Sequence, residues 1–113
     1  MDSGAQAERW SAAYLQRQGL KPVAQNYHSR FGEIDLIMQD GGALVFIEVR
    51  LRSREDYGGA ATSIDSHKQH RLIRTAQHYL AQLGLTPPCS FDVVLMDDAN
   101  GRNVQWLKNA FDA

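Results

Sequence analysis

Charged side chains interrupt two apolar runs in the stretch from Gly32 to Arg50, GEIDLIMQDGGALVFIEVR. Asp35 lies inside the first run, Glu48 lies inside the second, and Arg50 ends it. Paired carboxylates are the groups that hold a divalent cation, and an arginine binds phosphate through two parallel hydrogen bonds. Whether these groups can act together depends on the elements that carry them.

The dipeptide Gly41-Gly42 predicts a two-residue turn between two antiparallel strands. With these glycines as the loop, Asp35 faces Glu48 and Glu33 faces Arg50 on one side of the sheet. The four side chains are then expected to form a polar square at the end of the hairpin away from the turn. The other side is predicted to be entirely core, and carries Ile34, Leu36, Met38, Val45, Ile47 and Val49.

Opposed carboxylates repel each other, and burial strengthens the repulsion. A cation, a proton or a nearby arginine would offset this cost. A divalent metal satisfies the geometry directly, since Mg²⁺ is usually held by one or two carboxylates with water and phosphate in the remaining positions. The alternative is a solvated strand pair with a ladder of surface charges. That alternative explains Glu33 beside Arg50 well, and Asp35 opposite Glu48 poorly.

Periodicity and turn residues predict the elements around the hairpin. A helix is expected from about residue 5 to 18, with Ser3 as N-cap, followed by a strand at 22–27. A loop is expected at 51–63, then a helix from Ser66 to a C-terminal cap at Gly84, and strands at 91–96 and 104–107. The order αβββαββ predicts an α/β sandwich with a mixed sheet flanked by helices.

Composition indicates an ordinary folded domain. The 113 residues fit a single domain spanning 1–113, with 43% hydrophobic and 22% charged residues and a net charge of -1. A single cysteine, Cys89, excludes a disulfide framework and indicates a cytoplasmic protein. No apolar run is long enough to span a membrane, and the first ten residues lack the pattern of a signal peptide.

The pattern GEIDLI followed by LVFIEVR resembles the PD-(D/E)XK nuclease superfamily. More narrowly, the chain is similar to the bacterial YraN family of predicted endonucleases, which are related to archaeal Holliday junction resolvases. The resemblance covers most of the chain, and includes Glu8, Tyr14-Leu15, Asn26-Tyr27, Lys68, Arg71-Leu72, Ala76, Tyr79-Leu80 and Phe91-Asp92-Val93-Val94. It implies a restriction-endonuclease-like three-layer sandwich.

The resemblance also implies roles for individual residues. Asp35 and Glu48 correspond to the metal ligands, with Mg²⁺ or Mn²⁺ as the cofactor, and the backbone carbonyl of Val49 completes the protein ligands. Glu8 corresponds to a helical glutamate that touches the site, and Lys68 to a residue near phosphate. The implied reaction is hydrolysis of a DNA phosphodiester, including branched or junction DNA, by metal-activated water. Junction-cutting relatives act as dimers, so a homodimer is allowed.

Arg50 departs from the pattern, which has lysine at this position. A lysine can lose its proton beside a metal, whereas arginine essentially cannot. Arg50 is therefore assigned a role in orienting phosphate and stabilising negative charge. Two other functions stay open: a weakly active or inactive nucleic-acid-binding module with the same fold, and a protein-interaction domain.

Basic residues gather after the hairpin. Residues 50–74 contain six basic and three acidic residues, and the basic ones are Arg50, Arg52, Arg54, Lys68, Arg71 and Arg74. We expect Arg50, Arg52, Arg54, Lys68 and Arg71 to contact nucleic acid, although a solvated surface explains the same clustering about as well. The histidines His67 and His70 share a helix face, but solvent or phosphate contact explains them better than metal binding.

Overall fold

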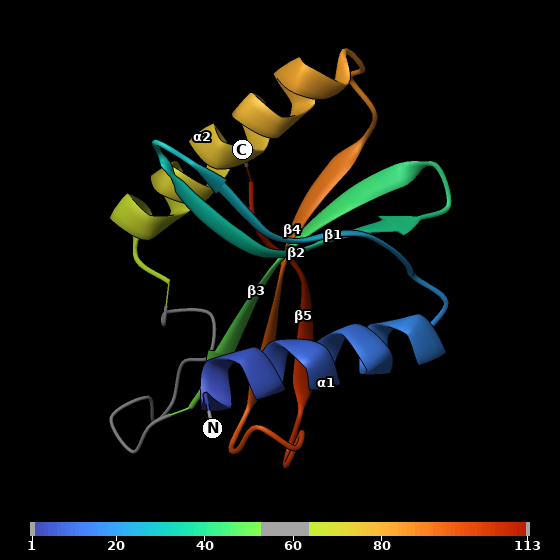
Figure 1. The fold of residues 1–113 in the computed structure, drawn as a ribbon, viewed down its shortest axis with the longest axis vertical. Helices are drawn as coiled ribbons and strands as arrows, with labels where there is room; N and C mark the ends of the chain where they lie inside the picture. Colours follow the sequence, from blue (N-terminus) through green and yellow to red (C-terminus); the bar gives the residue numbers. More distant parts are fainter. Residues whose placement is uncertain (1, 53–63, 113) are drawn as a thin grey trace.

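A computed structural model describes residues 2–52 and 64–112 and shows five strands and two helices in the predicted order. The chain runs through α1 (Ser3–Arg17), β1 (Lys21–Ser29), β2 (Gly32–Asp40), β3 (Ala43–Leu51), α2 (Ser66–Leu83), β4 (Cys89–Met96) and β5 (Gln105–Phe111). Figure 1 shows the two helices on opposite sides of the sheet, which confirms the predicted α/β sandwich with three layers.

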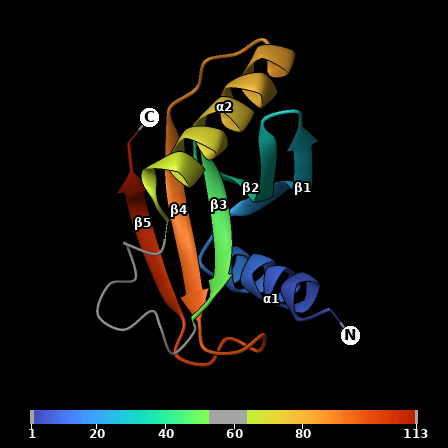
Figure 2. The ribbon, with the colours of Figure 1, turned by 90° about the vertical axis from the view of Figure 1, so that its left-hand side faces the viewer.

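The five strands lie in the order β1-β2-β3-β4-β5, with one parallel pair. The β3–β4 pair is parallel because α2 carries the chain back across the sheet between them, and the other three pairs are antiparallel. Figure 2 shows β3, β4 and β5 side by side, with α2 packed over them. The sheet is therefore mixed, as the sequence predicts.

Each face of the sheet packs against one helix. On one face, Leu36, Val45 and Ile47 form a buried cluster with Ala7 and Leu15 of α1. On the other face, Ile37, Phe46 and Phe91 form a second cluster with Leu72 and Ala76 of α2. Burial on both faces explains why β2, β3 and β4 read as nearly continuous apolar runs.

Helix α2 begins at Ser66 as predicted, whereas α1 begins at Ser3, earlier than the expected start at about residue 5. Asp2 rather than Ser3 caps α1, since its side chain accepts from the Gly4 N–H. Asp65 caps α2, since its side chain accepts a hydrogen bond from the Lys68 N–H at 2.8 Å. Aspartate and serine are equally good caps, so sequence alone could not separate them. At the other end of α2, the predicted cap Gly84 is confirmed, with a φ of 75°.

The hairpin has the predicted register near its turn and then opens. Five pairs from Asp40↔Ala43 to Leu36↔Ile47 confirm the Gly41-Gly42 loop. Beyond them the β2–β3 ladder stops, so the expected pairing of Glu33 with Arg50 is wrong: Glu33 pairs with His28 of β1, and Arg50 pairs with Leu95 of β4. β2 and β3 thus diverge after the Leu36↔Ile47 pair, and we call this point of divergence the fork.

The fork begins at Asp35, where the side-chain alternation also changes. Asn26, which would face Asp35 across the β1–β2 ladder, has a positive φ of 50° and interrupts the paired residues there. Ile34 consequently belongs to the cluster under α2, whereas Leu36 belongs to the cluster under α1. The prediction that Ile34 shares the Leu36 face is therefore wrong.

Neither helix in residues 2–52 and 64–112 has the length and apolar character needed to cross a membrane. The predicted loop at 51–63 lies mostly outside the described residues, although Leu51 itself ends β3.

Candidate functional site

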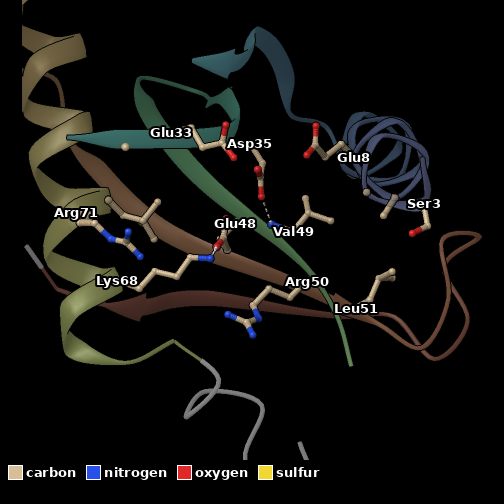
Figure 3. Close-up of a pocket in the computed structure, with 14 residues that line it drawn as sticks. Ser3, Glu8, Glu33, Asp35, Glu48, Val49, Arg50, Leu51, Lys68 and Arg71 are labelled. Carbon is tan, nitrogen blue, oxygen red and sulfur yellow. Dashed lines mark hydrogen bonds and ion pairs between the residues drawn. The ribbon is translucent and has the colours of Figure 1, made fainter. Parts of the chain in front are cut away.

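A cleft of about 550 Å³ opens where β2 and β3 separate, and its walls come from the two strands and both helices. The lining residues are Ser3, Gly4, Ala7 and Glu8 of α1, Gly32, Glu33 and Asp35 of β2, Glu48, Val49, Arg50 and Leu51 of β3, and Lys68, Arg71 and Leu72 of α2. The structure thus brings together most of the residues that the sequence nominated (Figure 3).

Asp35 is buried at the point of the fork, with 8% of its surface exposed. Its Oδ2 accepts a hydrogen bond from the Val49 N–H at 2.9 Å, so a side chain replaces the β2 backbone as partner of β3. Burial, together with a hydrogen bond and repulsion from Glu48, raises the pKa of Asp35 to about 8. The Val49 N–H opposes the rise only in part.

Glu48 is equally buried, with 6% of its surface exposed, and it meets a cation from α2. The Lys68 Nζ lies 2.5 Å from the Glu48 Oε2, and Figure 3 shows the lysine reaching across the cleft to it. Among the described residues this oxygen has no hydrogen-bond donor in good alignment, so the contact is an ion pair with room for a better ligand. Sequence analysis placed Lys68 near phosphate and missed this pairing.

Glu8 contributes a third carboxylate from α1. Figure 3 shows it facing Asp35 from the opposite wall of the cleft. Burial raises the pKa of Glu8 above its ordinary value, and hydrogen bonds with Asn26 and Asp35 partly offset this rise. The predicted placement of Glu8 beside Asp35 is thus observed, and its carboxyl holds a proton more readily than an exposed glutamate does.

Arg50 lines the same cleft but turns away from Asp35, as Figure 3 shows. Within the described parts of the chain it forms no salt bridge. Glu33 pairs instead with His28, whose Nδ1 lies 3.3 Å from the Glu33 Oε2, and both side chains are largely exposed. Arg50 thus lies in the wall of the cleft, with its guanidinium directed away from the Asp35 carboxylate.

The remaining basic residues divide into three cases. Arg71 lines the cleft beside Lys68. Arg52 is held by Asp97 at 2.7 Å, and also donates to the Asn103 carbonyl and to Gln105, so the structure shows it as a brace between β3 and the β4–β5 connection. Arg54 lies outside the described residues. Nucleic-acid contact by any of the three stays a prediction.

The donor set fits a hard divalent cation with an incomplete protein shell. No three His, Cys, Asp or Glu side chains in residues 2–52 and 64–112 converge closely enough to enclose a metal by themselves. Asp35 and Glu48 nevertheless offer two adjacent buried carboxylates, one with a raised pKa and one with a poorly satisfied oxygen. Mg²⁺ is commonly bound by two carboxylates, with water and phosphate as the other ligands.

The Val49 carbonyl is placed to join this set. In an extended strand the N–H and the carbonyl of one residue point to the same side. Since the Val49 N–H points to Asp35, its carbonyl also faces the gap left by β2. The predicted ligand role of this carbonyl agrees with its direction, and remains a prediction.

Comparison with known proteins places the chain among bacterial relatives of similar length. Residues 7–96 match the family described as "Uncharacterised protein family UPF0102". A UPF0102 protein of Nitrosospira multiformis is 50% identical over 96% of this chain and 92% of its own length. Another from Nitrosomonas europaea is 50% identical over 98% of this chain and 94% of its own length, and one from Cupriavidus necator is 53% identical over 96% and 82%.

Proposed function

From the premise that this chain belongs to the UPF0102 family, we propose that it is a metal-dependent nuclease that hydrolyses phosphodiester bonds in DNA. The observation that carries the proposal is the pair of buried carboxylates, Asp35 and Glu48, at the fork of the sheet. A fold seldom retains two adjacent buried acids unless a cation or proton compensates them.

The arrangement of charges supports a site for a cation and a phosphate. Asp35, Glu48 and the Val49 carbonyl would hold Mg²⁺ or Mn²⁺. When bound, such an ion supplies an activated water for attack on phosphorus and neutralises negative charge on the phosphate. Arg50, Lys68 and Arg71 line the same cleft and would bind and orient the phosphates of the substrate.

Lys68 has a second role in this proposal. β3 carries Arg50 where the pattern has a lysine, and an arginine cannot give up its proton. Lys68 brings an ammonium group to Glu48 from α2, and it can release that carboxylate by a change of side-chain rotamer. We therefore assign to Lys68 the compensation of Glu48 before substrate and metal arrive.

A nuclease assay on branched, duplex and single-stranded DNA with Mg²⁺ or Mn²⁺ tests the proposal. We expect Asp35→Ala and Glu48→Ala to abolish cleavage while circular dichroism shows a retained fold. The matched control is Asp98→Ala, which removes a carboxylate that does not line the cleft and should leave cleavage unchanged. Metal-dependent cleavage by both site variants would refute the assignment.

The second candidate, a nucleic-acid-binding module without hydrolytic activity, is favoured by Arg50 alone. It predicts salt-sensitive DNA binding with no cleavage by the wild type in either metal. Arg50→Lys separates the two candidates. A nuclease limited by its arginine should cleave faster after this substitution, whereas a pure binding module should still not cleave.

A further inference from the structure

An aromatic ring flanked by two arginines lies beside the cleft. Phe31 sits in the turn between β1 and β2, with the Arg30 guanidinium carbon 4.9 Å and the Arg74 guanidinium carbon 4.6 Å from the centre of its ring. Both arginines are exposed and Phe31 is partly exposed. We call Arg30, Phe31 and Arg74 the Phe31 platform.

Close packing against α2 fixes the position of this turn. Gly32 lies so near the helix that an added Cβ would be 3.4 Å from the Thr75 Oγ1 and 3.8 Å from the Arg71 Cβ. Its φ of 148° further favours glycine. Figure 1 shows the turn, in cyan, next to α2.

A second contact holds β1 to the same helix. The Tyr27 hydroxyl lies 2.6 Å from the His78 Nδ1 and donates to Gln82 at 3.0 Å. The His78 ring is also 6.3 Å from the Phe31 ring, nearly edge to face. The platform is thus supported on both sides of the turn, so a ligand would meet it already formed.

The charge of the platform is uncompensated within the described residues. Neither Arg30 nor Arg74 forms a salt bridge there. Two guanidinium groups on one ring repel each other, and a phosphate between them would relieve that repulsion. The ring and the planar guanidinium groups are also the surfaces on which nucleic-acid bases stack.

The platform continues the basic side of the cleft. Arg71 lies three residues before Arg74, and Lys68 three before Arg71, so the three side chains follow one face of α2. Arg71 and Lys68 line the cleft, and Gly32, next to Phe31, lines it too. A strand bound at the carboxylates therefore has a continuous basic path to Phe31.

We infer that the Phe31 platform binds an unpaired nucleotide of a single-stranded segment, with its base stacked on the ring or a guanidinium and its phosphate between the arginines. The inference rests on the proposed function, which places the bound DNA strand in the cleft beside the carboxylates. It specifies the substrate as DNA with a single-stranded segment next to the point of cleavage. A regular duplex keeps its bases stacked inside and cannot use the ring.

Fluorescence anisotropy with a labelled oligothymidine and a labelled duplex of equal length tests this in EDTA, where no metal is present. Phe31→Leu keeps an apolar side chain but removes the aromatic face. We expect it to weaken oligothymidine binding about 5- to 100-fold, which corresponds to the loss of one stacked base. Duplex binding should change less than about 2-fold. Phe31→Trp should restore or exceed wild-type binding.

Arg74→Gln tests the phosphate contact. The slope of log affinity against log salt concentration should fall in magnitude by about 0.7 for the single strand. The matched control is Val23→Ala, which alters an exposed apolar residue on β1 away from the turn. Thermal melts of all variants establish that each is folded.

Equal losses on single strand and duplex after Phe31→Leu, or no loss on either, would overturn the inference. These outcomes are independent of hydrolysis. Absence of metal-dependent cleavage together with a Phe31-dependent preference for single strands would refute the nuclease and leave the platform standing. Metal-dependent cleavage without a Phe31-dependent preference for single strands would support the nuclease and refute the platform.

Discussion

Replacing Asp35 by asparagine should stabilise the metal-free protein at neutral pH. The structure shows a carboxyl that accepts from the Val49 N–H and shares a hydrogen bond with Glu48. Asparagine reproduces both interactions without a charge, since its carbonyl accepts from Val49 and its NH₂ donates to Glu48. The substitution keeps the shape of the site and removes only the ionisation.

The magnitude follows from the pKa of Asp35, which burial and the neighbouring Glu48 together raise from 3.8 to about 8. Because the folded pKa is the higher one, the folded protein holds a proton that the unfolded chain releases between pH 4 and 8. The stability linked to this proton is complete below pH 4 and is lost by about 1.4 kcal/mol per pH unit until pH 8. At pH 7 the loss reaches about 4 kcal/mol, and we expect Asp35→Asn to recover about 2–4 kcal/mol of it.

Urea unfolding at pH 4, 5.5, 7 and 8.5 in EDTA measures this effect. The gap between variant and wild type should be near zero at pH 4, grow through pH 7, and level off above pH 8. Added Mn²⁺ should stabilise the wild type more than the variant. Equal stabilities at pH 7, or a gap that does not shrink at pH 4, would refute the reasoning.

Asp97→Asn is the matched control for Asp35→Asn. Hydrogen bonds from Asn103 and Arg52 lower the pKa of Asp97, so this carboxylate stabilises the fold when ionised. Its stabilising effect is present above the unfolded pKa and is lost as the pH falls through the folded one. The substitution should therefore reduce stability at pH 7, opposite in sign to Asp35→Asn.

Two further substitutions test contacts of the fold, one within the cleft and one outside its lining. Lys68→Met should leave Glu48 buried without its counter-charge and lower the free energy of unfolding at pH 7 by ~1–3 kcal/mol in urea titrations. Mn²⁺ should stabilise this variant more than it stabilises the wild type, and an unchanged stability would argue against the ion pair. Gly101→Ala should lower the free energy of unfolding by ~3 kcal/mol or more in the same titrations, because an added Cβ would overlap the Trp10 ring and the φ of Gly101 is 85°. The control is Gly42→Ala, whose Cβ meets open space and should change stability by less than ~0.5 kcal/mol.

The sequence predicted those features of the site that depend on neighbouring residues. The Gly41-Gly42 turn set five pairs of the hairpin correctly, because a two-residue loop and alternating strands are local signals. That register was enough to predict that Asp35 and Glu48 lie close together, and both line one cleft.

Other features depend on contacts between distant segments. At the fork the Asp35 side chain takes the Val49 N–H in place of a backbone carbonyl, and strand patterns cannot show such a substitution. The pairing of Lys68 with Glu48 joins α2 to β3, and the Phe31 platform joins a turn to the same helix. Charge clustering in residues 50–74 indicated a basic surface, but only the fold separates Arg52, which braces β3, from Arg71, which faces the cleft.

The fork in the sheet also orders the steps by which this domain folds. The β2–β3 hairpin has a two-residue connection, as the β1–β2 hairpin does, and can form within microseconds, whereas the parallel β3–β4 pair must wait for the α2 crossover. Asp35 and Glu48 therefore meet first in water, where their repulsion is weak. The penalty for burying the two acids arises only when the helices dock and exclude solvent, and docking of α2 brings the Lys68 ammonium to Glu48 in the same step.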